Sequence, residues 1–212
     1  MSMMILPIRP QICNLSVINI EFIISAALML TAAVIAALLS ARYATGVFKG
    51  NKKKTMLCFV GIAVCVTLAL VCFFGCAAIT VKGIIFALIL VFSSYEDIKK
   101  RECDDYLHLM IVIAAFIGTE LSAVPKMFFS AMFAGGLMLA TMLMTKSSIG
   151  GADIKMAAAC SFLLGISRGI VGLLIGMVLA VAFNIFKKDK KKGFPMIPYL
   201  AVGYMAAYFI QV

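Results

Sequence analysis

The sequence predicts an all-α, polytopic integral membrane protein, and three observations support this fold class. Hydrophobic residues make up 64% of the 212 residues, charged residues make up 13%, and the mean hydropathy is +1.13. A soluble domain is nearer half apolar and a quarter charged. The apolar residues also fall in long stretches separated by short basic loops. These stretches use up the chain, so we expect residues 1–212 to form one transmembrane domain.

Eight apolar stretches are candidate membrane-spanning helices, because about 20 helical residues cross roughly 30 Å of hydrocarbon. They run near residues 18–40, 56–76, 79–95, 105–119, 127–145, 154–165, 169–186 and 199–212. The first stretch is too long and too weakly preceded by basic residues for a cleaved signal peptide, so we interpret it as an anchor. The sixth is short, and the preceding Gly150 and Gly151 suggest that the backbone dips toward the bilayer surface there.

The basic residues predict one orientation in the membrane. The loops at 41–55, 96–104, 146–153 and 187–198, counted with the adjoining Lys155, hold 15 of the 19 basic residues. The remaining four are Arg9, Lys82, Lys126 and Arg168. By the positive-inside rule the four loops are cytoplasmic and both termini lie outside. Topology therefore explains most of the net charge of +10, and we expect no nucleic-acid partner.

Small residues in two stretches predict helix packing. Gly172, Gly176 and Ala180 recur every four residues and would form a groove for a neighbouring helix. A row of cysteines with similar helical spacing is interpreted in the same way, as packing residues; they are Cys58, Cys65, Cys72 and Cys76. The seven cysteines form no C-x-x-C pair and no cluster with histidine, so we expect no metal site and no cofactor.

Asp97 and Asp153 are the candidate catalytic residues. Asp97 lies where the third stretch leaves the membrane and Asp153 where the sixth enters it, so we expect both at one depth on the cytoplasmic side. An aspartyl protease needs such a pair: one ionised carboxylate activates water and one protonated carboxyl polarises the scissile carbonyl. The spacing alone leaves a second interpretation open, in which Asp153 caps a helix and Asp97 pairs with the basic residues 99–101.

The residues around both aspartates resemble those of the type IV prepilin peptidases. In "DIKKRECDDYL", Asp97 and Lys99 match the first family motif, Asp105 stands for its asparagine, and Cys103 and Asp104 replace Ile-Pro. The second motif, Gly-x-Gly-Asp followed by a hydrophobic residue and lysine, is similar to "GGADIK", residues 150–155, with Ala152 in place of the second glycine. "FPMIPYLAVG", residues 194–203, is similar to the proline-rich start of the family's last span.

This resemblance implies a membrane aspartyl peptidase with Asp97 and Asp153 as the catalytic pair. Gly150, Gly151 and Ala152 would shape the approach to Asp153, because backbone without bulky side chains admits a peptide and permits the turn into the helix. The implied substrate is a prepilin or pilin-like precursor, cleaved at the cytoplasmic face of the cell's inner membrane. The implied activity is peptidase only, because the loop at 41–55 is short and has no cysteine where larger family members carry a cysteine-bearing insertion.

Four further residues near the aspartates have two interpretations each. Lys99 and Lys155 either position the acids or serve only as topogenic charges. Asp104 and Asp105 would cap the fourth helix. The acids Glu96, Glu102, Asp104 and Asp105 could also attract a basic leader.

Two other function classes remain as alternatives. One is a presenilin-like intramembrane aspartyl protease, in which a tyrosine adjoins the first aspartate, whereas Tyr95 here is two residues from Asp97. The other is a non-catalytic scaffold or transporter, for which we would expect broken helices in both halves of the chain. His108 has no histidine or cysteine partner in sequence and is interpreted as a packing residue.

Overall fold

The computed structural model describes residues 19–48, 51–145, 150–186 and 194–210, and within these ranges the chain is all-helical, without a strand. In the described residues eight α-helices follow one another, in agreement with the eight predicted apolar stretches. They are α1 (Ile20–Phe48), α2 (Lys52–Phe74), α3 (Ala78–Lys100), α4 (Asp105–Ala115), α5 (Val124–Thr145), α6 (Gly151–Leu164), α7 (Ile166–Phe186) and α8 (Ile197–Phe209), with a 3₁₀ helix, η2 (Leu121–Ala123), before α5. The predicted all-α fold is confirmed.

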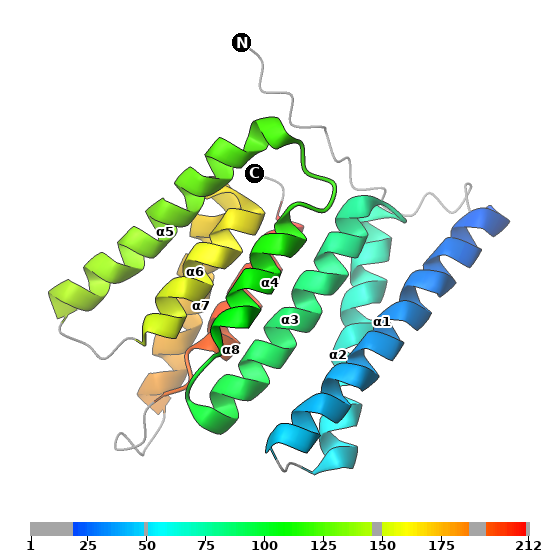
Figure 1. The fold of residues 1–212 in the computed structure, drawn as a ribbon, viewed down its shortest axis with the longest axis horizontal. Coiled ribbons are helices and arrows are strands. Elements are labelled where there is room, and N and C mark those ends of the chain that lie inside the picture. Colours follow the sequence, from blue (N-terminus) through cyan, green and yellow to red (C-terminus); the bar gives the residue numbers. More distant parts are fainter. Residues whose placement is uncertain (1–18, 49–50, 146–149, 187–193, 211–212) are drawn as a thin grey trace.

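Within the part of the chain that the structure describes, five helical segments are long and apolar enough to cross a membrane: α1, α2, α3, Leu121–Met144 and Ile166–Ile185. The other three helices are shorter than the roughly 20 residues that a full crossing takes: α4 has 11 residues, α6 has 14 and α8 has 13. The eight-span count therefore stays a prediction. Consecutive helices run in alternate directions through the bundle (Figure 1), so the short helices follow the same up-and-down path as the long ones.

The ends of the helices that flank the four basic loops lie on one side of the bundle, the lower side in Figure 1. We call this side the loop end. It consists of the C-terminal ends of α1, α3, α5 and α7 and the N-terminal ends of α2, α4, α6 and α8. The alternation therefore agrees with the prediction that the four loops share one side. Which side of the membrane they face stays a prediction, and the predicted outer location of the termini falls on residues outside the described ranges.

The predicted small-residue groove packs α7 against α8. A Cβ atom added to Gly172 would meet Tyr204, and one added to Gly176 would meet the main chain of Leu200. On the facing helix, a Cβ atom at Gly203 would collide with the backbone of Gly172 and Gly176. Glycine at these positions lets the two helices approach closely and fixes the position of α8.

The packing interpretation is wrong for three of the four cysteines of the second stretch. Cys58, Cys65 and Cys72 are exposed, and Cys76 is half-buried. The seven-residue spacing does put the first three on one face of α2, but this face points away from the bundle. The inward face is filled by Phe59, Ala63, Thr67, Leu70 and Phe74, which are buried. The spacing predicted a shared face without indicating which side of the helix faces the bundle.

Candidate active site

Asp97 lies within the last turn of α3, at the loop end of the bundle. The prediction that a loop begins at residue 96 is wrong, because α3 continues to Lys100. Lys99 and Lys100 in this last turn favour the helix, since cations stabilise the negative end of the helix dipole. As a result, the Asp97 side chain is held on a regular helix and is only 6% exposed.

The first residue of α8 binds the Asp97 carboxylate. The backbone N–H of Ile197 donates a hydrogen bond to Oδ2 of Asp97 over 3.1 Å. The first N–H groups of a helix have no partner within the helix, Pro198 has no N–H, and the N–H of Tyr199 binds the carbonyl of Met196. Ile197 therefore offers its N–H to a partner outside the helix, and the positive end of the α8 dipole favours a carboxylate there.

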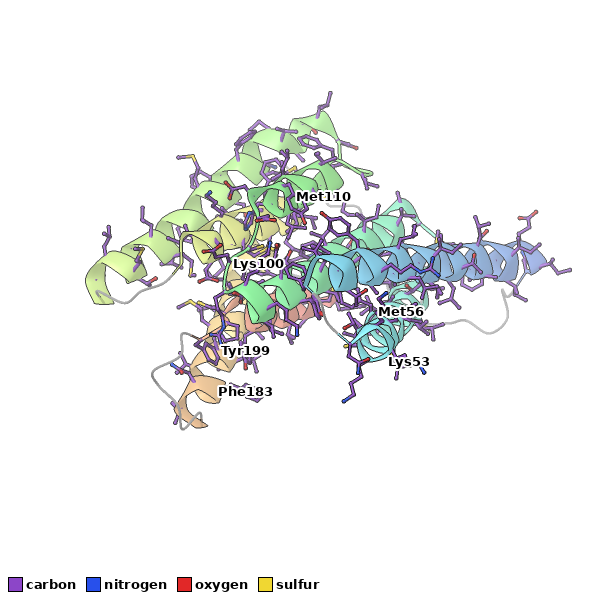
Figure 2. All side chains as sticks on the ribbon, turned by 60° about the horizontal axis from the view of Figure 1, so that its bottom comes forward. Lys53, Met56, Lys100, Met110, Phe183 and Tyr199 are labelled. Carbon is purple, nitrogen blue, oxygen red and sulfur yellow. The ribbon has the colours of Figure 1, made fainter. Side chains whose placement is uncertain are left out.

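The loop end of the bundle is turned toward the viewer in Figure 2. Lys100 marks the end of α3 in this view, and Tyr199 and Phe183 mark where the start of α8 lies beside the end of α7. The rings of Tyr199 and Phe183 are in contact, with centroids 5.2 Å apart. The proline-rich segment that the sequence singled out thus brings a backbone donor to Asp97, a role that only the docking of α8 reveals.

Asp153 lies in the first turn of α6, which begins at Gly151, two residues before the predicted boundary of the preceding loop. Its Oδ2 accepts a hydrogen bond from the N–H of Gly150 over 3.1 Å, and its own N–H binds the carbonyl of Gly150. Asp153 therefore does stabilise the start of a helix, as the capping interpretation proposed. This role does not exclude chemistry, because the side chain keeps its other oxygen.

The two carboxyl groups are close enough to interact. Burial is the main cause that raises the pKa of Asp153 to about 6, and the negative charge of Asp97 raises it further, while the N–H of Gly150 acts in the opposite direction. Asp97 and Asp153 come from different helices, and the docking of α3, α4, α6 and α8 brings them together. The predicted convergence at one end of the bundle therefore agrees with the structure.

The glycine segment has a simpler backbone than the sequence suggested. Gly150 has φ −67° and ψ 143°, which any residue adopts, so its conformation does not require glycine. A Cβ atom at Gly150 would instead lie 3.2 Å from Oδ2 of Asp153. Among the described residues a Cβ atom at Gly151, which is exposed, would meet nothing within 4 Å, while Ala152 is half-buried.

Neither of the predicted positioning lysines pairs with Asp97 or Asp153 among the ion pairs of the described residues. The Lys99 ammonium lies 5.7 Å from the ring centroid of Tyr95. The Lys155 ammonium binds both carboxylate oxygens of Asp105, at 2.7 and 2.9 Å. The cation whose charge acts on Asp97 is Arg101, one of the basic residues 99–101 that the second interpretation paired with Asp97.

The residues at the start of α4 also have defined places. Asp104 occupies the N-cap position of α4, but its side chain forms no capping hydrogen bond. Asp105, in the first turn, is engaged by Lys155. His108 is 7% exposed, and its Nδ1 lies 3.9 Å from Oδ1 of Asp105. These observations agree with the interpretation of His108 as a packing residue.

Comparison with known proteins gives a family for this arrangement. Residues 84–185 match the model of the type IV leader peptidase family. The matched segment begins within α3, ends within α7 and contains Asp97, Gly150, Gly151, Ala152 and Asp153. Searches of curated proteins and of solved structures found no match. The family match and the residues it contains support the assignment of the chain to the type IV leader peptidase family.

Proposed function

We propose that the protein is an aspartyl endopeptidase that removes the short basic leader from prepilin-like precursors at the cytoplasmic face of the cell's inner membrane. Such precursors supply type IV pili and related secretion systems. The observation that carries this proposal is the interaction of Asp97 with Asp153, which raises the pKa of the Asp153 carboxyl. Family membership supports the peptidase activity and the class of substrate.

Both carboxyls are largely buried, but different groups stabilise their charges. Against the effect of burial, Asp97 accepts the N–H of Ile197 at the start of α8 and is attracted by Arg101, and both interactions favour its ionised form. The pKa of Asp153 is raised to about 6 by burial and by Asp97. We assign Asp97 as the general base and Asp153 as the carboxyl that holds the proton of the pair, which titrates as one coupled unit.

The reaction then needs only these two groups and water. Asp97 takes a proton from water as its oxygen attacks the scissile carbonyl carbon, and Asp153 donates its proton to the carbonyl oxygen. As the tetrahedral intermediate collapses, the C–N bond breaks and Asp97 gives its proton to the leaving amine. Asp153 recovers a proton from the hydroxyl of the intermediate when the new carboxyl forms. No step of this scheme involves a metal ion or a cofactor.

The surroundings of Asp153 fit a peptide substrate. The exposed Gly151 has no neighbour within 4 Å of a Cβ position, so an extended peptide could lie over the start of α6. The apolar helix that follows the leader would remain between the spans while the leader stays at the loop end. Of the four acids that could attract the leader, Glu96 is buried against Lys100 and Asp105 is bound to Lys155. Asp104 also lies near the Lys100 ammonium, so Glu102, which is exposed, is the acid that remains to attract the leader.

We propose peptidase activity without N-methylation, within a single transmembrane domain. α1 and α2 are separated only by residues 49–51, which leaves no room there for the insertion of the larger family members. Family membership also favours a leader peptidase over the presenilin-like protease and over the scaffold or transporter.

Cleavage of a model prepilin in membranes tests the proposal. Wild type, Asp97→Asn and Asp153→Asn would be compared by the size shift of the product and by sequencing its new N-terminus. Asparagine keeps the shape of aspartate and removes the acid. We expect wild type to cut after the leader and each variant to lose at least about a thousandfold in rate. Cleavage by both variants at the wild-type rate would contradict the proposal. Glu120→Gln is the matched control, because Glu120 is an exposed acid at the N-cap of η2.

A further inference from the structure

Glu96 is the residue before Asp97, and its side chain is only 1% exposed. Its Oε1 accepts a hydrogen bond from the Lys100 ammonium over 3.1 Å, and its Oε2 accepts one from the backbone N–H of Asp104 over 3.3 Å. Burying a carboxylate is costly unless it is paired and hydrogen-bonded. Glu96 is therefore not a solvated surface acid, and its two contacts account for its burial.

These contacts close the α3–α4 loop, residues 101–104. Lys100 is the last residue of α3 and Asp104 is the N-cap of α4, so Glu96 binds both ends of the loop. The Lys100 ammonium also lies 3.8 Å from Oδ2 of Asp104 and 4.9 Å from the ring centroid of Phe48 in α1. The loop contains no proline that would stiffen it. Its closed shape therefore depends on side-chain contacts.

The loop contains one strained residue. Arg101 has φ 64°, and it is the only non-glycine residue of the described chain in the left-handed region. Residues other than glycine keep this conformation only where the surroundings hold it. The contacts of Glu96 with Lys100 and Asp104, on either side of the strained residue, supply that hold.

The same loop determines the surroundings of Asp97. The N–H of Arg101 binds the carbonyl of Asp97 over 2.9 Å, and the Arg101 guanidinium attracts the Asp97 carboxylate. If the loop opened, the last turn of α3 would lose its C-cap and Arg101 would leave Asp97. The Asp97 side chain would then be free to move away from the start of α8.

We propose that Glu96 is a positioning residue for Asp97, holding the α3–α4 loop closed so that Asp97 stays in place opposite Asp153. This inference rests on the proposed function, because it gives Asp97 a catalytic role. Glu96 does not touch the substrate in this account. It acts through the loop, on the rate of the chemical step.

Cys103 provides a reporter of loop closure that does not depend on catalysis. Its side chain is 8% exposed, within the α3–α4 loop. Burial is the main cause that raises the pKa of the Cys103 thiol to about 12, and the charge of Glu96 adds to it. A buried thiol with a raised pKa reacts slowly with alkylating reagents, so opening of the loop would speed its modification. Glu96→Gln removes the same charge as Glu96→Ala, so a faster reaction in Glu96→Ala than in Glu96→Gln reports opening of the loop rather than loss of that charge.

The experiment compares wild type, Glu96→Ala, Glu96→Gln and the control Glu120→Ala, all as full chains in membranes. Alkylation of Cys103 by N-ethylmaleimide would be followed by peptide mapping, and kcat and KM would be measured for a model prepilin. For Glu96→Ala we expect Cys103 to react at least about tenfold faster, and kcat to fall about 10- to 100-fold. KM should stay within about twofold of the wild-type value, because the substitution displaces the reacting carboxylate of Asp97 rather than a surface that binds substrate.

Glu96→Gln should lie between wild type and Glu96→Ala, since its amide oxygen still accepts the N–H of Asp104 while the ion pair with Lys100 is lost. The control Glu120→Ala should match wild type, because Glu120 is an exposed acid at the N-cap of η2. Wild-type Cys103 reactivity together with wild-type kcat in Glu96→Ala would overturn the proposal. A loss confined to KM would overturn it as well, because a positioning residue acts on kcat.

Two further outcomes separate the inference from the proposed function. If wild type does not cut the substrate, the proposed function fails, while the Cys103 reaction still decides whether Glu96 closes the loop. If Glu96→Ala does not accumulate, Glu96→Gln decides: faster Cys103 reaction with a lower kcat supports the proposal, and wild-type values of both overturn it.

Discussion

The backbone N–H of Ile197 donates a hydrogen bond to the carboxylate of Asp97 over 3.1 Å, joining the first residue of α8 to the last turn of α3. Asp97 therefore has a fixed donor on one side and the second aspartate, Asp153, within range of its charge. A carboxylate in this position is oriented by the fold before any substrate arrives.

Asp153→Asn should stabilise the protein at high pH. The folded-state pKa of Asp153, about 6, lies above the usual aspartate value of 3.8, so ionising this carboxyl favours the unfolded state as the pH rises through 6. Asparagine has no such penalty. At pH 8 we expect the free energy of unfolding of the variant to exceed that of wild type by about 1–2 kcal/mol, after allowance for the partial exposure of Asp153. The variant should therefore melt at a higher temperature.

Thermal melting of both proteins in detergent at pH 4 and pH 8 checks this prediction. Near pH 4 Asp153 is largely protonated in the folded state and much of the difference should vanish. Equal melting temperatures at both pH values would mean that the Asp153 carboxyl is not held in a buried, charged environment.

Lys155→Gln should have a small effect on cleavage. The Lys155 ammonium binds Asp105 rather than Asp153, and this ion pair is exposed, with 57% and 75% of the two side chains accessible. Exposed pairs contribute at most about 1 kcal/mol, so the rate should fall no more than about fivefold. Asp105→Asn should have the same effect, and the double variant should be no worse than either single variant. A far larger loss in Lys155→Gln than in Asp105→Asn would indicate direct action of Lys155 on Asp153.

Gly203→Ala should destabilise the protein and lower cleavage. A Cβ atom at this position would collide with the backbone of Gly172 and Gly176, so α8 would be pushed away from α7. Overpacking of this kind costs about 1–3 kcal/mol, and α8 also carries the Ile197 donor.

Gly61→Ala is the matched control for this substitution. Gly61 lies in the middle of α2, where a Cβ atom would meet nothing within 4 Å. Alanine there should leave stability unchanged or raise it by roughly 0.5–1 kcal/mol, because it lowers the entropy of the unfolded chain. Melting temperatures and cleavage rates of the two variants can be compared directly. An equal response to both substitutions would mean that the α7–α8 contact does not hold α8 in place.

Much of the fold could be predicted from the sequence, because long apolar stretches and basic loops are strong signals in a membrane protein. Each predicted stretch became one helix. The boundaries were less accurate where charged residues continue a helix: α1 runs to Phe48 and α3 to Lys100, beyond the apolar part of each stretch. Apolar length marks the part of a helix that suits lipid, and it does not mark where the helix ends.

The site was predictable only in part. Charge at two helix ends, together with the family motifs, predicted Asp97 and Asp153 as the candidate catalytic pair. The donor from Ile197 could not be found in this way, because it depends on how α8 docks against α3. Counting charges placed Glu96 on the same side as the other acids without indicating that it is buried. The partner of Lys155 likewise depends on the packing of α4 against α6.

The central claim is that Asp97 and Asp153 act as one pair, and the titration of Asp153 in wild type and in Asp97→Asn tests it most directly. With aspartate labelled with ¹³C at its carboxyl, nuclear magnetic resonance would follow Asp153 across pH in detergent, with Asp153→Asn used to assign its signal. We predict a pKa of about 6 in wild type and a lower value in Asp97→Asn, still above 3.8 because burial remains. An Asp153 pKa that is unchanged when the charge of Asp97 is removed would contradict the account.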